Sequence, residues 1–165
     1  VSWIVRAARM LGPDLSTADG QNPKGFTAWR VVTNPYFDQA GMKLLDPSGP
    51  NGWHEHSAWL NSNTIRYRTK LASALTLAET YNTGAETLTL FPTNVDAWFS
   101  TAPSTSLAVY DRLVALLQPE PIPVAVREAW LAALWPGAFT WDAASKTKAR
   151  ELAFLILCSP AAQLY

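Results

Sequence analysis

The stretch NSNTIRYRTKLASALTLAETY, residues 61–81, carries the clearest fold signal in the chain. Asn61 or Ser62 stands at its start, and both residue types cap helices by accepting hydrogen bonds from free backbone N–H groups. The apolar residues that follow recur at helical spacing: Ile65, Leu71 or Ala72, Leu75 and Ala78. The pattern predicts a long amphipathic helix that ends at about Tyr81.

Arg68 lies on the same apolar line, three residues after Ile65 and four before Ala72. A guanidinium on the inward face of a helix needs hydrogen-bond acceptors, because an unpaired buried charge costs several kcal/mol. The nearest candidate acceptors in the sequence are backbone carbonyls of the irregular segment before the helix. We therefore expect Arg68 to tie that segment to the helix.

This irregular segment, from Leu45 to Trp59, is rich in Pro and Gly, which exclude regular secondary structure. It carries Trp53 and Trp59 within otherwise polar sequence. Long loops in compact domains are usually packed or functional. We expect the two indoles to anchor the loop on the helical body.

Periodicity and capping residues predict further helices on both sides of this loop. They span residues 1–11, 35–44, 104–117, 123–135 and 142–159, with a slight preference for helix over strand at 25–34. Residues 94–99 predict a single helical turn, and residues 88–90 a short extended piece. The expected fold class is all-α, an irregular bundle of six or seven helices with a long Trp-anchored loop, in a single helical domain over residues 1–165.

The last predicted helix has an unusual second half, because residues 152–158 are apolar on every face. Such a helix end is either buried all round or covered by another protein surface. The chain also begins at Val1 within a predicted helix. Both features favour a part of something larger.

Composition excludes several classes of protein. The chain has 165 residues, with 13 Lys+Arg and 13 Asp+Glu, so its formal net charge is zero. This balance argues against nucleic-acid or polybasic membrane binding, because both depend on clustered positive charge. One Cys excludes an internal disulfide and a Cys-based zinc cluster. No apolar run approaches the roughly 18 residues that span a bilayer.

His54 and His56 are the only histidines, and they flank Glu55 in the loop. In an extended chain they face the same side, and Asp46 or Glu55 could add a ligand. A zinc site needs three or four defined ligands, however, and the sequence supplies no helical His pair or Cys partner. The pattern favours a solvated loop tip, and we expect no metal and no cofactor.

The sequence names no catalytic residue. It has neither a nucleophile elbow nor a glycine-rich phosphate loop after a strand. A carboxylate pair for glycoside hydrolysis stays open, because separation in space cannot be read from spacing in sequence. Candidates for such a carboxylate pair are Glu55, Glu79 and Glu86.

Eight Trp residues suggest either core packing or stacking on sugar rings. Core packing is favoured for the indoles within predicted helices: Trp3, Trp29, Trp130 and Trp135. Trp53 and Trp59 lie in the loop and are the candidates for ligand binding.

Three blocks of sequence point to a family. The central block is Leu44-Leu45-Asp46-Pro47, Asn51-Gly52-Trp53, Ala58-Trp59-Leu60-Asn61-Ser62-Asn63-Thr64-Ile65 and Arg68. The others are VSWIVRAARMLG at residues 1–12 and LILCSPAAQ at residues 155–163. In this order they resemble a large bacterial family, the domain of unknown function DUF1800. The chain departs from the family pattern at residues 54–56, where Pro-Gly-Gly is usual, so the histidines inherit no role.

The resemblance carries over five residues as a structural motif. Gly52 permits a turn, Trp53 and Trp59 anchor the loop, Asn61 caps the helix, and Arg68 ties loop to helix. Members of the family are longer, carry an additional N-terminal helical half, often bear export signals and are commonly encoded beside a sulfatase-like partner family. The resemblance therefore implies the C-terminal portion of an exported, extracytoplasmic bacterial protein.

We expect an assembly or interaction module without its own catalytic residues. Its partner is another protein chain or the N-terminal half of a longer protein. Two alternatives stay open. One is part of a hydrolase-type enzyme whose site that half completes, and the other is a glycan-binding module that uses Trp53 and Trp59.

Overall fold

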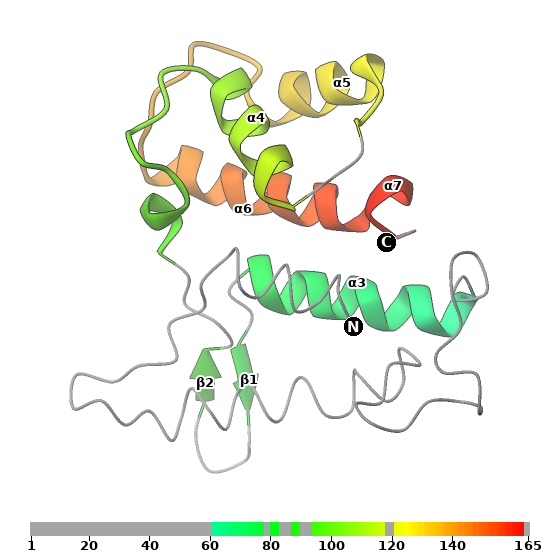
Figure 1. The fold of residues 1–165 in the computed structure, drawn as a ribbon. Coiled ribbons are helices and arrows are strands. Elements are labelled where there is room, and N and C mark those ends of the chain that lie inside the picture. Colours follow the sequence, from blue (N-terminus) through cyan, green and yellow to red (C-terminus); the bar gives the residue numbers. More distant parts are fainter. Residues whose placement is uncertain (1–60, 78–79, 83–86, 90–93, 118–120, 164–165) are drawn as a thin grey trace.

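A computed structural model describes residues 61–77, 80–82, 87–89, 94–117 and 121–163 of the chain. This part is predominantly helical, which confirms the all-α prediction in its coarse form (Figure 1). The helices number α3 to α7, with one 3-10 helix, η2, and two short strands, β1 and β2. The predicted helices before residue 61 lie outside the described residues.

Helix α3, Ser62–Thr76, begins as the sequence predicts. The Asn61 side chain accepts hydrogen bonds from the backbone N–H of Asn63 at 3.0 Å and of Thr64 at 2.9 Å. The Thr64 hydroxyl in turn accepts from the Asn61 N–H at 3.2 Å. This reciprocal capping box satisfies N–H groups that a helix start leaves free.

The predicted end of this helix at Tyr81 is wrong, because α3 ends at Thr76. Tyr81 belongs instead to strand β1, Thr80–Asn82, which pairs antiparallel with β2, Thr87–Thr89. Tyr81 lies opposite Leu88 in this register. Thr and Tyr favour strands, and strand pairing prevails over continuation of the helix.

The remaining elements follow from their caps. Asn94 caps η2, Val95–Trp98, and the Thr105 hydroxyl accepts from the Ala108 N–H near the start of α4, Ser106–Leu117. Helix α5, Val124–Leu134, begins after Pro123, which is its N-cap and not its first helical residue as predicted. Asp142 caps α6, Ala143–Cys158, and the short α7, Pro160–Gln163, follows Ser159.

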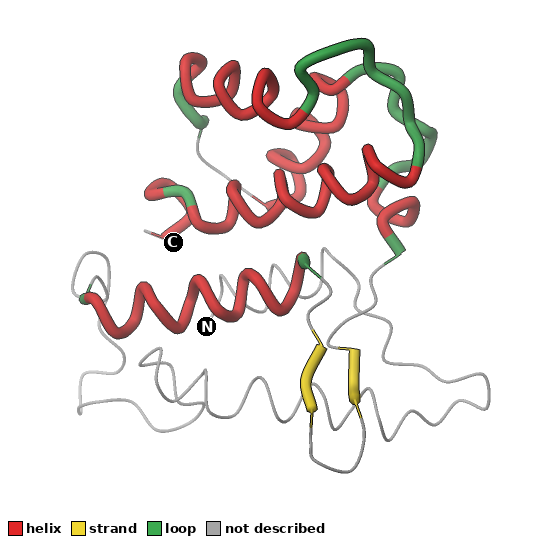
Figure 2. Tube along the Cα trace, turned by 180° about the vertical axis from the view of Figure 1, so that it is seen from behind, coloured by secondary structure: helices red, strands yellow, loops and turns green. Residues whose placement is uncertain are grey.

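Helix α6 is the centre of the described fold. It lies between α3 on one side and α4 with α5 on the other (Figures 1 and 2). Its fully buried residues Ala149, Leu152, Ala153 and Ile156 join one core with Leu71 and Leu75 of α3 and Val109 and Leu113 of α4. Burial of each Leu or Ile side chain contributes about 1.5–3 kcal/mol.

The apolar end of α6 is covered within the chain. No residue from 152 to 158 is exposed: four are buried and Phe154, Leu155 and Cys158 are partly buried. Of the two explanations that the sequence left open, burial by the chain's own helices accounts for it.

The indoles divide as the structure places them. Among the described residues, Trp98 is the largest fully buried side chain. Trp135 is buried, and Trp130 and Trp141 are partly buried against the core. The core assignment of Trp130 and Trp135 therefore fits the structure. Trp3, Trp29, Trp53 and Trp59 lie outside the described residues.

Candidate functional site

Arg68 is buried in α3 with only 4% of its surface exposed. Its Nη1 donates a hydrogen bond of 2.5 Å to the backbone carbonyl of Gln163 in α7. Burial lowers the pKa of the Arg68 guanidinium below its ordinary value. The loop carbonyls that the sequence suggested as acceptors lie outside the described residues. One acceptor within the described residues comes instead from the other end of the sequence.

A second arginine connects α6 to the C-terminal end of α3. Arg150 of α6 donates from Nη1 to the carbonyl of Thr76 at 3.3 Å. Arg68, in the middle of α3, contacts Gln163, which lies beyond the end of α6. Thr76, at the end of α3, contacts Arg150 in the middle of α6. Helices α3 and α6 therefore run antiparallel (Figure 1). The two arginines act as structural ties in this geometry.

Apart from Asn61, which caps α3, the other sequence-predicted site residues lie outside the described part of the chain. These are Asp46, Gly52, Trp53, His54, His56 and Trp59. Within the described residues, no group of three or more His, Cys, Asp or Glu side chains could hold a metal ion. No helix in the same ranges combines the length and apolar character that crossing a bilayer requires.

Asp96 of η2 is the centre of a polar contact that sequence reasoning missed. Its carboxylate accepts hydrogen bonds from Lys146 Nζ of α6 at 2.6 Å and from Trp141 Nε1 at 3.2 Å. The Lys146 hydrogen bond is the main cause that lowers the pKa of Asp96, and Trp141 adds to it. The cluster pins η2 to the start of α6. No local sequence motif predicts this contact, because Asp96 and Lys146 are 50 residues apart in the sequence.

Aromatic side chains continue from this cluster. Phe99 meets Trp141 edge-on with ring centroids 5.0 Å apart, and Phe139 stacks on Trp141 at 6.4 Å. Phe139 also lies 5.9 Å from Trp135. Trp135 is buried, and Phe99, Phe139 and Trp141 are partly buried against the core.

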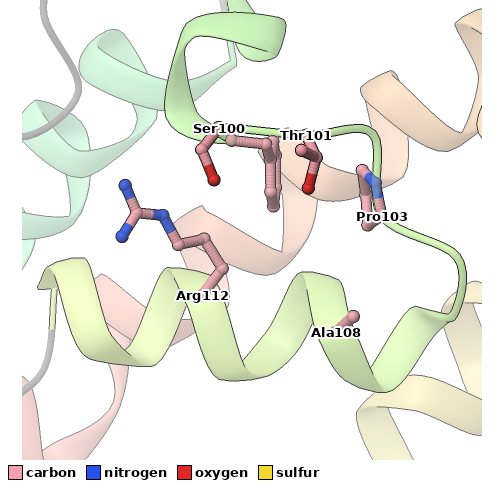
Figure 3. A pocket seen from close by; sticks show the side chains of 6 residues that line it. Ser100, Thr101, Pro103, Ala108 and Arg112 are labelled. Atoms are coloured by element: carbon pink, nitrogen blue, oxygen red, sulfur yellow. The ribbon is translucent and has the colours of Figure 1, made fainter.

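A small pocket opens between the end of η2 and α4 (Figure 3). It has a volume of about 150 Å³ and is lined by Phe99, Ser100, Thr101, Pro103, Ala108 and Arg112. Arg112 donates from Nε to the carbonyl of Trp98 at 2.8 Å, and its guanidinium lies beside Ser100 at one end of the pocket (Figure 3). No carboxylate is among the described residues that line this pocket.

Helix α5 presents an unusual surface. Its sequence VAVREAWLAAL is mostly apolar, yet none of its 11 residues is buried. Val124 is 57% exposed and Val126 is 38% exposed. Arg127 and Glu128 form an ion pair of 3.6 Å on the same helix. A surface helix of a monomer normally turns a charged face to solvent, so this helix is a candidate interface.

Comparison with known proteins identifies the family but no characterised relative. The family described as a protein of unknown function, DUF1800, matches residues 1–164. No curated protein and no solved structure matches the chain. The match extends over nearly the whole chain, in agreement with the resemblance of its three sequence blocks. The chain belongs to the DUF1800 family of proteins of unknown function.

Proposed function

We propose that the chain is an assembly module that docks through one face of α5 onto a second copy of itself. The observation that carries the proposal is the incomplete burial of this largely apolar helix. None of its 11 residues is fully buried, and Trp130, Leu131 and Leu134 pack only partly against the core. Helices of this composition gain their stability from burial of an apolar face. A partner surface over α5 supplies that burial.

The docking face follows helical spacing. Val124, Arg127, Glu128 and Leu131 stand at positions i, i+3, i+4 and i+7, so they share one side of α5. We call these four residues the α5 seam. Val124 is exposed, whereas Leu131 packs partly against the chain's own core and forms the border of the seam. The side chains of Arg127 and Glu128 are 30% and 68% exposed, respectively.

The order of residues in the seam is self-complementary. In an antiparallel pair of α5 helices about a two-fold axis, Val124 of one copy lies against Leu131 of the other. Arg127 then lies against Glu128 of the second copy, and the same contact repeats on the other side of the axis. A two-fold interface requires this reciprocity, because the same patch serves both copies. A second copy supplies an opposite charge for both Arg127 and Glu128. An unrelated partner does so only if its own surface carries the matching pattern, so the charges favour a second copy.

The expected dimer is weak. A helix of 11 residues is about 16 Å long, and one such pair buries less than the ~1,200 Å² of a standard stable interface. We expect a Kd on the order of 100 µM. Assembly in the cell would then depend on local concentration or on further contacts.

Sedimentation velocity of the purified chain tests the proposal across concentrations from about 10 µM to about 1 mM, which bracket this Kd. We expect a concentration-dependent dimer in the wild type and a monomer in Val124→Asp. Leu107→Asp is the matched control, because Leu107 is 43% exposed and belongs to α4 and not to α5. A wild-type chain that stays monomeric throughout would remove the second copy as occupant. A dimer weakened equally by both substitutions would remove α5 as the interface.

The wider setting of the module comes from the family resemblance. For the whole chain we propose an irregular bundle of six or seven helices, with a loop anchored by Trp53 and Trp59. We place the protein in bacteria and outside the cytoplasm, as part of an exported assembly that includes other protein chains. The hydrolase and glycan-binding alternatives rest on residues outside the described ranges, and no described contact favours either one.

A further inference from the structure

We propose that the pocket between η2 and α4 binds a carboxylate on a short apolar group, with Arg112 and Ser100 as its polar contacts. This inference is independent of the α5 interface. It rests on the orientation of one guanidinium, on the distribution of polar and apolar groups in the pocket, and on the volume.

Arg112 is an exposed residue of α4 whose guanidinium is anchored through one nitrogen. Its Nε donates to the Trp98 carbonyl at 2.8 Å, which fixes the plane of the guanidinium and leaves both terminal nitrogens for another acceptor. Within the described residues, these terminal nitrogens have no hydrogen bond or ion pair. A guanidinium edge with two parallel N–H groups matches the two oxygens of a carboxylate.

The pocket has a polar end and an apolar end. The Ser100 hydroxyl points towards the guanidinium of Arg112, while Pro103 and Ala108 lie at the opposite end (Figure 3). Thr101 adds a hydroxyl between them, and the partly buried Phe99 forms part of the wall. A carboxylate at the Arg112 end therefore directs its apolar group towards Pro103 and Ala108.

Size and charge narrow the ligand class. The pocket is open to solvent, and its volume of about 150 Å³ limits the ligand to a small organic molecule. The absence of a carboxylate among the lining residues avoids repulsion of an anionic ligand. The apolar end disfavours a fully hydrated phosphate, which has no group to place there. A ligand of so few atoms binds weakly, with a Kd on the order of 1 mM.

The test is a titration of the purified chain with butanoate, followed by NMR of backbone amides. We expect saturable shifts confined to residues 99–112, and none with butanamide, which has the same shape without the charge. Inorganic phosphate is the competing probe. Phosphate that binds more tightly than butanoate overturns the carboxylate class, and shifts spread over all Lys and Arg residues overturn the site.

Variants separate the site from general attraction of anions. Arg112→Gln should weaken butanoate binding at least tenfold. Arg112→Lys should weaken it nearly as much, because an ammonium lacks the two parallel N–H groups of the guanidinium edge. Arg66→Gln, at an exposed arginine of α3, should change nothing. Ala108→Leu fills the apolar end without touching Arg112, so it should also abolish binding even if the Arg112 variants alter the local fold. Unchanged binding in Ala108→Leu contradicts the proposal.

N-acetyl-alanine distinguishes the two sources of such a carboxylate, because it imitates the C-terminus of a peptide. Tighter binding than butanoate assigns a peptide terminus as the source. Weaker binding assigns a free small acid.

Discussion

The Arg68 guanidinium in α3 donates to the carbonyl of Gln163 in α7, across 95 residues of sequence. This bond joins the first described helix to the last one. The Gln163 side chain extends the link, because its Nε2 donates to the carbonyl of Leu157 in α6 at 2.6 Å. The three helices α3, α6 and α7 are therefore joined by polar bonds as well as by apolar packing.

Arg68→Ala should lower the free energy of unfolding by more than about 2 kcal/mol. The substitution removes a charged hydrogen bond, leaves the buried Gln163 carbonyl without this donor and deletes the packed stem of the side chain. Denaturant unfolding followed by Trp fluorescence gives the measurement. Arg66→Ala is the control on the exposed face of the same helix, and it should cost less than about 0.5 kcal/mol. An equally small cost at Arg68 would show that the buried bond is not a tie.

The Asp96–Lys146 pair should make stability depend on pH. Because the pKa of Asp96 is lowered in the fold, its contribution is fully present above the ordinary value of 3.8 and is lost as the pH falls through the folded value. The melting temperature of Asp96→Asn should thus lie below that of the wild type at neutral pH, and the difference should vanish on acidification. High salt should also narrow it, since the pair is exposed.

Asp111→Asn provides the comparison for Asp96, because Asp111 is exposed on α4 and has no ion pair with a described residue. Its melting temperature should follow that of the wild type at every pH. If Asp96→Asn behaves in the same way, the contact with Lys146 does not stabilise the fold.

Ser145→Ala should destabilise the turn between α5 and α6. The Ser145 hydroxyl accepts from the buried Trp135 indole at 3.1 Å and donates to the Thr140 carbonyl. Its removal leaves the indole N–H without that acceptor, at a cost of about 1–3 kcal/mol in the free energy of unfolding. Trp135→Phe combined with Ser145→Ala should cost less than the sum of the single changes, since the two residues share one bond. Additive costs would argue against the bond. Thr147→Ala, at an exposed hydroxyl of α6, should have little effect.

Cys158 should react slowly with thiol reagents in the folded chain. It is partly buried in α6, and burial raises the pKa of its thiol above 9.0. As the only Cys in the sequence, it gives an unambiguous signal in a colorimetric thiol assay. We expect slow labelling without denaturant and fast labelling in urea. Equal rates would contradict the described packing.

Features with a local physical cause could be predicted from sequence. Asn61 and Asp142 accept hydrogen bonds from N–H groups two or three residues ahead, so residue type and position suffice to identify the starts of α3 and α6. The early end of α3 depends on the pairing of β1 with β2, which competes with helical periodicity. Helical periodicity alone therefore does not locate the end of α3.

Features that depend on distant partners could not be predicted. Periodicity placed Arg68 on the inward face of α3 but did not reveal that α7 lies opposite. The contact between Asp96 and Lys146 also joins residues far apart in the sequence, so periodicity does not reveal it. The exposure of α5 was missed for a related reason, because an apolar helix reads as core until the surrounding helices are known.

The central claim is that α5 joins two copies of the chain through reciprocal Arg127–Glu128 contacts, and charge reversal tests it most directly. Arg127→Glu or Glu128→Arg places like charges together at both symmetric contacts, whereas the double variant Arg127→Glu/Glu128→Arg restores opposite charges. Equal free energies of unfolding in all four proteins would show that the fold is unchanged. Sedimentation velocity should give a dimer of similar Kd for wild type and double variant, and about tenfold weaker association for each single variant. Single variants that dimerise like the wild type, or a double variant that stays monomeric, would contradict the account.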